Sequence, residues 1–395
     1  MSLNALKTGF IGIILGICFF ITAIPLYAEV GVTDTSVKVG CIADTTGPIA
    51  GMGIHFVHGV ECLVKNINDT GGIHGRNIIF RHESDNYSPP QAMAITKKLA
   101  FSDKVFCFVA TLGATQTMAQ IPLFQKEKIP LIGPGGSELK FGFPPKRYIF
   151  AIHPSNQSYG QCMVDFMVHD LKSKNKKASM IFQQGFIGDA NKEGVDKQMS
   201  KYGLKLVASA GYKRGAVDLS SHVLKCKNAG AEVLFIGGMS AQASLILKEA
   251  AKISWKPTVI LHPGAADTRF IKLGGSAVEG AFVCQNAQDP QTSSLPGVIK
   301  YKNLLKKYYP KSPPTNWGIS GYVAMAVLEK GLQDAGKNLT REGLVNALEN
   351  LKEFKTDVLP PITYGPNNRL GANMSFFVKV IDGKFVKQTD YRHPR

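Results

Sequence analysis

Three short loops rich in Ser, Thr and Gly could bind an anion. They are Thr45-Thr46-Gly47, Thr111–Thr117 and Gly135-Gly136-Ser137, and each follows an apolar segment that predicts a strand. Hydroxyl groups and the free N–H groups at the start of a helix both donate hydrogen bonds, and the helix dipole favours negative charge there. The same residues could instead cap helices. Three such loops at one sheet edge favour a site for a small carboxylate.

Other motifs argue against catalytic or cofactor chemistry. Gly51-Met52-Gly53 supplies two glycines of a dinucleotide fingerprint, but Phe56 stands where the third is needed. The sequence has no GxxxxGK[ST] phosphate loop, and residues 237–241 are not a GxSxG nucleophile elbow. His55 and His58 have no acidic or cysteine partner at metal-ligand spacing. We therefore expect no cofactor, no metal and no enzyme activity.

Strands and helices alternate along the chain in two series. Apolar segments predict strands at 37–42, 78–81, 105–110, 129–132 and 148–152, and again at 178–182, 205–210, 233–236, 258–261 and 280–285. Such βαβ repetition builds parallel sheets covered by helices. Helices at 295–309, 319–335 and 341–351 come next, and apolar strands follow near 374–381. Two series of similar size predict an α/β fold with two lobes.

The first residues are typical of a secretory signal peptide. Lys7 precedes an apolar run over 9–24, which is followed by Pro25 and the small residue Ala28. We expect cleavage near Ala28, so that residues 1–28 are removed and the protein is periplasmic. An uncleaved anchor helix is the alternative, because the run approaches the length of a membrane span.

The chain is basic, with a formal net charge of +17. Its Lys and Arg residues are spread out, and the densest runs are at 172–177 and 302–307. An exported protein meets little nucleic acid, so we expect no nucleic-acid partner. A solvated surface, an anionic membrane surface or an anionic ligand explains the charge.

The cysteines beyond the signal peptide do not form a disulfide pattern. They are widely spaced within apolar segments, at Cys41, Cys62, Cys107, Cys162, Cys226 and Cys284. A small disulfide-stabilised fold would cluster them, so we expect buried free thiols. The alternative is a Cys41–Cys107 pair, because both residues fall on strands that could be neighbours.

The chain resembles the type I periplasmic-binding-protein family, in particular its leucine/isoleucine/valine-binding branch. The resemblance rests on VKVG with TTGPIAGMG (37–53), INDTGGIHGRNIIFRHESDN (67–86), Pro89-Pro90-Gln91-Ala92, GATQTMA (113–119) and IPLIGPGGS (129–137). It implies two Rossmann-like lobes with parallel central sheets, joined by three hinge crossovers near 149–153, 284–290 and 356–363. Lobe 1 would then comprise residues 29–150 and 288–356, and lobe 2 residues 151–287 and 357–395.

The resemblance also implies a ligand site between the lobes. In lobe 1 the segment Gly113–Thr117 and Ser137 would hold a ligand carboxylate, with the Gly135 carbonyl facing an amino group. From lobe 2, Phe186 or Ile187, Met239 and the loop 262–267 match pocket positions. The residues expected at the site are Met52, Ala114, Thr115, Gln116, Gly135, Gly136, Ser137, Phe186, Met239, Gly264, Asp267 and Trp317.

Three departures from the family pattern bear on the ligand. Ala114 replaces a serine, so Thr115 or backbone N–H groups must bind the carboxylate. Gly264 replaces the acidic residue that pairs with a ligand ammonium, and Asp267 is the candidate substitute, because an unpaired buried ammonium is costly. Met52 and Met239 replace aromatic residues with flexible groups that fit varied ligands. A carboxylate without an α-amino group is therefore an alternative to a branched-chain amino acid.

Taken together, these features predict an exported solute-binding protein. It would capture an amino acid, branched-chain or related, or another small carboxylate, and deliver it to an ABC permease. Contact with the membrane would occur only through permease docking. The alternative is a ligand sensor of the same fold that signals to a partner protein.

Overall fold

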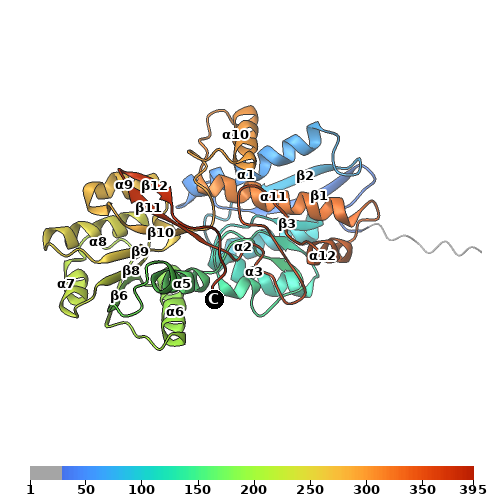
Figure 1. The fold of residues 1–395 in the computed structure, drawn as a ribbon. Helices are drawn as coiled ribbons and strands as arrows, with labels where there is room; N and C mark the ends of the chain where they lie inside the picture. Colours follow the sequence, from blue (N-terminus) through green and yellow to red (C-terminus); the bar gives the residue numbers. More distant parts are fainter. Residues whose placement is uncertain (1–28) are drawn as a thin grey trace, which may run out of the picture.

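Two central sheets organise the molecule into two lobes (Figure 1). The structure is a computed structural model and describes residues 29–395, so the predicted signal peptide lies outside the described residues. Within that range, no helix has the length and apolar character needed to cross a membrane.

The sheet of lobe 1 has five parallel strands in the order β2-β1-β3-β4-β5. Its strands are β1 (Ser36–Ile42), β2 (Asn77–Glu83), β3 (Cys107–Val109), β4 (Leu131–Ile132) and β5 (Ile149–Phe150). Apolar side chains bury both faces of this sheet, as expected for parallel strands. One face packs against α1 (Ala50–Asp69), α10 (Pro296–Tyr308), α11 (Asn316–Ala335) and α12 (Arg341–Glu349). The other packs against α2 (Pro89–Lys97), α3 (Ala114–Lys126) and α4 (Leu139–Gly142).

Helices α1 and α11 cross in close contact beside this sheet (Figure 1). A Cβ atom on Gly59 would lie 1.8 Å from the Gly318 carbonyl oxygen, so only glycine allows the two backbones to approach this closely.

The sheet of lobe 2 has seven strands in the order β12-β11-β10-β9-β8-β6-β7. Five are mutually parallel: β6 (Ala178–Gln183), β7 (Ala208–Tyr212), β8 (Val233–Gly237), β9 (Thr258–Leu261) and β10 (Phe282–Gln285). Helices α5 (Asn156–Asp165) and α6 (Phe186–Lys201) cover one face, and α7 (Ser220–Asn228), α8 (Ser240–Lys252) and α9 (Thr268–Gly274) cover the other. The predicted fold class of two α/β lobes is thus confirmed.

An antiparallel hairpin extends the edge of the lobe 2 sheet. Strands β11 (Phe376–Ile381) and β12 (Lys384–Lys387) pair with each other, and β11 pairs with β10. The two-residue turn Asp382-Gly383 has positive φ at both positions, which is the geometry of a tight type I′ hairpin. Short π-helical and 3₁₀ turns complete the secondary structure at Lys98–Ser102, Phe166–Asp170, Pro263–Ala265 and Gly275–Val278.

The third passage of the chain between the lobes lies later than the sequence indicates. A crossover near 356–363 would give residues 357–395 to lobe 2. Instead, the extended segment after α12 packs in the core of lobe 1 through Tyr364 and Ala372. Further along the chain, Phe376 is the first residue that packs in the core of lobe 2. The boundary is corrected accordingly, and residues up to Ala372 pack with lobe 1.

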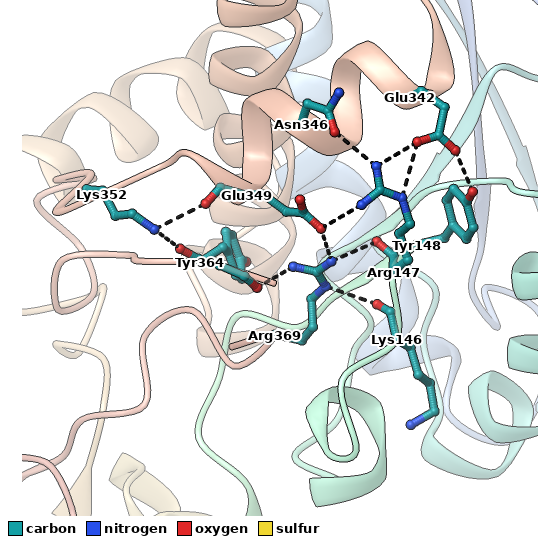
Figure 2. A network of polar contacts seen from close by, with 10 residues as sticks. Lys146, Arg147, Tyr148, Glu342, Asn346, Glu349, Lys352, Tyr364 and Arg369 are labelled. Atoms are coloured by element: carbon teal, nitrogen blue, oxygen red, sulfur yellow. Dashed lines mark hydrogen bonds and ion pairs between the residues drawn. The ribbon is translucent and has the colours of Figure 1, made fainter. Parts of the chain in front are cut away.

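A buried arginine holds this extended segment in place (Figure 2). Arg369 is 2% exposed and donates hydrogen bonds to the carbonyl oxygens of Lys146 (3.0 Å) and Arg147 (3.2 Å). It also forms an ion pair with Glu349 of α12, and its guanidinium lies 4.6 Å from the centre of the Phe150 ring. The segment is therefore fixed to both α12 and β5.

The six cysteines among the described residues are all buried and free. Cys41 and Cys107 do lie on the neighbouring strands β1 and β3, but they form no disulfide. Burial raises the pKa of the Cys107 thiol to about 12, so the thiol is not reactive at neutral pH. The expectation of buried free thiols is confirmed.

Candidate ligand-binding cleft

A cavity of about 490 Å³ lies between the two lobes. In lobe 1 it is lined by the start of α1 and by the loops that follow β3 and β4. In lobe 2 it is lined by the segments that follow β6, β8 and β9. These are the carboxyl ends of parallel strands, where α/β proteins bind their ligands, and the volume is in the usual range for small molecules.

Most of the residues predicted for the site do line this cavity. They are Met52, Ala114, Thr115, Gly135, Gly136, Ser137, Phe186, Met239, Gly264 and Trp317. Gln116 does not, because its side chain is buried beneath the loop. Asp267 does not either: its Oδ1 caps α9 by accepting the Phe270 N–H (3.1 Å) and also accepts the Ser240 hydroxyl (2.8 Å).

The N-terminus of α3 opens onto the cavity with free donors. Its N-cap residue Gly113 has φ +112°, and no side chain caps the helix. The first N–H groups of a helix have no acceptor within the helix, so those of Ala114 and Thr115 are available to a ligand. The Ser137 hydroxyl lies on the adjacent loop, which is tied to α3 by a hydrogen bond from Gly113 N to the Gly135 carbonyl (3.1 Å). This arrangement can bind a carboxylate.

The loop Thr45-Thr46-Gly47, by contrast, has its donors already occupied. The buried carboxylate of Asp44 accepts hydrogen bonds from the N–H groups of Thr46 (3.1 Å), Gly47 and Ile49 (2.9 Å). Only the apolar residues Ile49 and Met52 from this region reach the cavity. This loop is therefore closed by Asp44 and does not bind a ligand through its backbone, but its threonines cap no helix either, because α1 begins without a side-chain cap.

A buried polar chain crosses from lobe 1 to lobe 2 at the cavity wall. Glu138, Asn156 and His262 are each less than 10% exposed, and all three line the cavity. The Asn156 amide donates to Glu138 Oε1 (3.5 Å), and its Oδ1 accepts from His262 Nε2 (3.0 Å). His262 Nδ1 in turn accepts the Gly264 N–H (3.0 Å), which fixes the neutral tautomer.

Burial shifts the pKa values of both titratable groups in this chain. It lowers the pKa of His262 to about 3, so the imidazole is neutral at physiological pH. It raises the pKa of the Glu138 carboxyl, against the opposing effects of the Asn156 hydrogen bond and of Lys140.

Tyr159 of α5 completes the polar side of the cleft. Burial raises the pKa of its phenol, so the hydroxyl stays protonated beside Ser137. Its ring meets His262 edge-on, with 5.4 Å between ring centres. A smaller cavity of about 180 Å³ shares Ser137 and Tyr159 and extends to the hinge, where Asn286 and His153 are hydrogen-bonded (2.9 Å).

The remaining walls are mainly apolar. Met52 and Trp317 come from the starts of α1 and α11, and Phe186 and Met239 come from lobe 2. Phe186 is 53% exposed, so a hydrophobic ligand group bound against it would bury apolar surface. Arg214 is an exposed cation on the lobe 2 side.

Several cavity residues were not identified from the sequence: Tyr87, Glu138, Asn156, Tyr159, Gln183, Gln184 and Arg214. Two of them carry a local signal, because Glu138 directly follows Ser137 and Gln183 is a polar residue at the end of an apolar strand. Asn156 and Tyr159 lie on a helix whose first turns are largely buried, so their pattern indicates core packing.

No cluster of three or more metal-ligating side chains occurs within residues 29–395. The two histidines of α1, His55 and His58, each lie 3.0 Å through Nδ1 from the hydroxyl of Ser312.

Comparison with known proteins agrees with this architecture. A family model described as "Periplasmic binding protein" matches residues 36–384, and the chain belongs to this family. Curated relatives include Leu/Ile/Val-binding protein homolog 3 of Brucella melitensis, which is 24% identical over 89% of this chain and 93% of the relative. Leu/Ile/Val-binding protein homolog 1 of Brucella suis is 26% identical over 88% of this chain and 92% of the relative. The chain thus falls in the leucine/isoleucine/valine-binding-protein-like branch.

Two solved structures illustrate the shared fold. A branched-chain amino acid ABC transporter protein from Thermus thermophilus with bound valine has a TM-score of 0.79, with 20% identity over 92% of this chain and 97% of the other. A fatty acid ABC transporter substrate-binding protein from Thermomonospora curvata has a TM-score of 0.76, with 21% identity over 92% and 94%.

Proposed function

We propose that this protein is exported to the periplasm, captures an amino acid or related small carboxylate in the interlobe cleft, and delivers it to an ABC permease. The observation that carries the proposal is the pair of adjacent loops at the cavity, where the uncapped N-terminus of α3 and the Ser137 hydroxyl both offer hydrogen-bond donors. The apolar walls suit an aliphatic or aromatic side chain of the solute.

A binding screen tests the solute class. Purified protein would be melted in the presence of α-amino acids, of carboxylic acids without an amino group, and of the amides of the same acids, which lack the carboxylate. A ligand that binds only the folded state raises the melting temperature. We expect stabilisation by one or more carboxylates and none by the matched amide. Stabilisation by the amide alone would contradict carboxylate recognition.

Replacing the Ser137 hydroxyl tests its role. Ser137→Ala should weaken the carboxylate ligand found in the screen by about 1–3 kcal/mol, because a hydrogen bond to a charged group is lost. Isothermal titration calorimetry measures the change. Ser276→Ala is the control, since Ser276 is exposed and outside the cavity. Equal affinity of wild type and Ser137→Ala would remove this hydroxyl from the site.

Delivery to a permease is tested in cells. Deleting the gene should abolish high-affinity uptake of the identified solute, and the wild-type gene should restore it. Unchanged uptake combined with a lost cellular response to the solute would instead support the sensor function.

A further inference from the structure

We propose that Glu138 is the counter-charge for a cationic group on the bound solute, so that the cleft selects a zwitterion, such as an α-amino acid, over a simple carboxylate. The inference rests on the proposed function and deepens it, because it assigns the group that recognises the second charge of the ligand. It also places that group in lobe 1, directly beside the carboxylate site.

Glu138 is positioned for this role by its neighbours in the chain. It follows Ser137 directly, and both residues line the cavity. Two charges of one small solute are a few bonds apart, so their recognition sites must also be adjacent. The helix N-terminus at Ala114 would hold the carboxylate, and the Glu138 side chain lies on the same loop as the Ser137 donor.

The carboxyl of Glu138 is incompletely satisfied by the protein. It is 8% exposed and accepts one long hydrogen bond, from the Asn156 amide at 3.5 Å. Within residues 29–395 no lysine, arginine or histidine forms an ion pair with it. A buried carboxylate without a cation is costly, and either a proton or a cationic ligand group removes that cost.

The other acidic groups near the cleft are engaged elsewhere. Asp267 caps α9 and accepts the Ser240 hydroxyl. Asp189 accepts the N–H of Gly185 (2.8 Å) at the start of α6 and does not line the cavity. Asp289 lines only the smaller chamber, where it caps the turn at Gln291 (3.0 Å). Glu138 is thus the carboxyl that lines the main cavity.

The charged and titratable groups around Glu138 do not neutralise its carboxylate by direct contact. Lys140 lies on α4, two residues further along the chain, and acts on Glu138 only through space. His262 is neutral and turned toward Asn156, and the Tyr159 phenol is protonated. Arg214 is exposed on the lobe 2 side of the cavity.

Matched ligand pairs and one isosteric substitution test the assignment. The pairs are α-amino acids and the 2-hydroxy acids of the same carbon skeleton, titrated calorimetrically into wild type and Glu138→Gln. We expect wild type to bind the best amino acid about 30-fold or more tightly than its hydroxy counterpart, because a desolvated charge pair is lost with the amino group. Glu138→Gln should bind that amino acid about 30-fold or more weakly and the hydroxy acid within about 3-fold of wild type.

Glu329→Gln is the matched control, because Glu329 is another partly buried acid whose pKa is raised by burial and it lies outside the cavity. Its affinities should equal those of wild type. Two results would overturn the inference and leave carboxylate capture intact. One is equal affinity of wild type for the amino acid and its hydroxy counterpart. The other is an unchanged amino-acid affinity in folded Glu138→Gln. If Glu138→Gln does not fold, the wild-type ligand pairs alone decide. If wild type binds no carboxylate of either kind, the proposed function itself fails and this inference fails with it.

Discussion

At the residue scale, His262 shows how burial at the cleft couples protonation to folding. Both ring nitrogens are committed, Nδ1 to the Gly264 N–H and Nε2 to Asn156, and the side chain is 5% exposed. Its pKa falls to about 3 in the folded protein, whereas an unfolded chain has a value near 6.5. Between these values the unfolded state binds more protons, so stability falls as the pH is lowered.

This linkage gives a prediction for the pH dependence of unfolding. Lowering the pH from 7.5 to 5 should remove about 2 kcal/mol of unfolding free energy through His262 alone. Urea denaturation of wild type and His262→Gln at both pH values isolates the contribution of His262 to the unfolding free energy. His153 and Glu138 titrate in both proteins, so their contributions cancel in the difference. Wild type should lose about 2 kcal/mol more than the variant. Parallel losses would show that His262 does not stay neutral in the folded state.

The sequence located two hydroxyl residues that line the cavity, Thr115 and Ser137, but not the acidic residue Glu138 that lines it as well. Ser137 and Thr115 follow apolar strands, so their position at a sheet edge could be inferred locally. Glu138 stands beside them, but its burial depends on Asn156 in the other lobe, and the family pattern directed attention to position 264. A contact made across the cleft leaves no local signal in the sequence.

At the element scale, the start of α3 depends on a backbone shape that only glycine adopts readily. Gly113 has φ +112° and ψ +121°, outside the regions open to other residues. A Cβ atom there would lie 2.4 Å from Oε1 of Gln116 and 3.2 Å from the ring of Tyr87. The conformation of Gly113 therefore sets the direction of the Ala114 and Thr115 N–H groups.

Gly113→Ala should consequently damage binding and stability together. We expect about 1–3 kcal/mol of backbone strain and an affinity for the carboxylate ligand that falls about tenfold or more, as the helix start shifts. Gly203→Ala is the control: it has φ +71° in open space after α6, so it carries strain without touching the cleft. Calorimetric titration and thermal melting of both variants separate the two effects. Equal affinity in Gly113→Ala and Gly203→Ala would contradict the role of the loop.

The presence of most strands and helices was predictable from the sequence, but the order of the strands within each sheet was not. The apolar runs in the sequence located the βα series of both lobes, because the central strands β3, β6 and β8 are buried on both faces. The order β2-β1-β3-β4-β5 arises from pairings between distant segments, and no local pattern encodes it. The hairpin of β11 and β12 likewise joins the lobe 2 sheet by pairing with β10, whose sequence lies far upstream.

At the scale of the whole molecule, the position of the third crossover could not be derived from the sequence. The segment after α12 has little regular structure, and its place is set by contacts with residues about 200 positions earlier, such as Arg369 with Lys146 (Figure 2). Because this segment is bound to lobe 1 up to Ala372, the free link to lobe 2 before Phe376 is short. A short link would suit a hinge, since few residues would need to change conformation if the lobes moved relative to each other.

Removing the buried guanidinium tests this anchoring. Arg369→Met should lower the unfolding free energy by about 3–5 kcal/mol, because Glu349 and the three backbone carbonyls of Lys146, Arg147 and Gly365 lose their partner in a buried site. Arg147→Met is the control: Arg147 pairs with Glu342 and Glu349 in the same network, but its side chain is 43% exposed, so its loss should cost about 1 kcal/mol or less. Urea denaturation measures both. A smaller loss for Arg369→Met than for Arg147→Met would show that the crossover segment is not held by its buried arginine, and the hinge would then have to include the residues between α12 and β11.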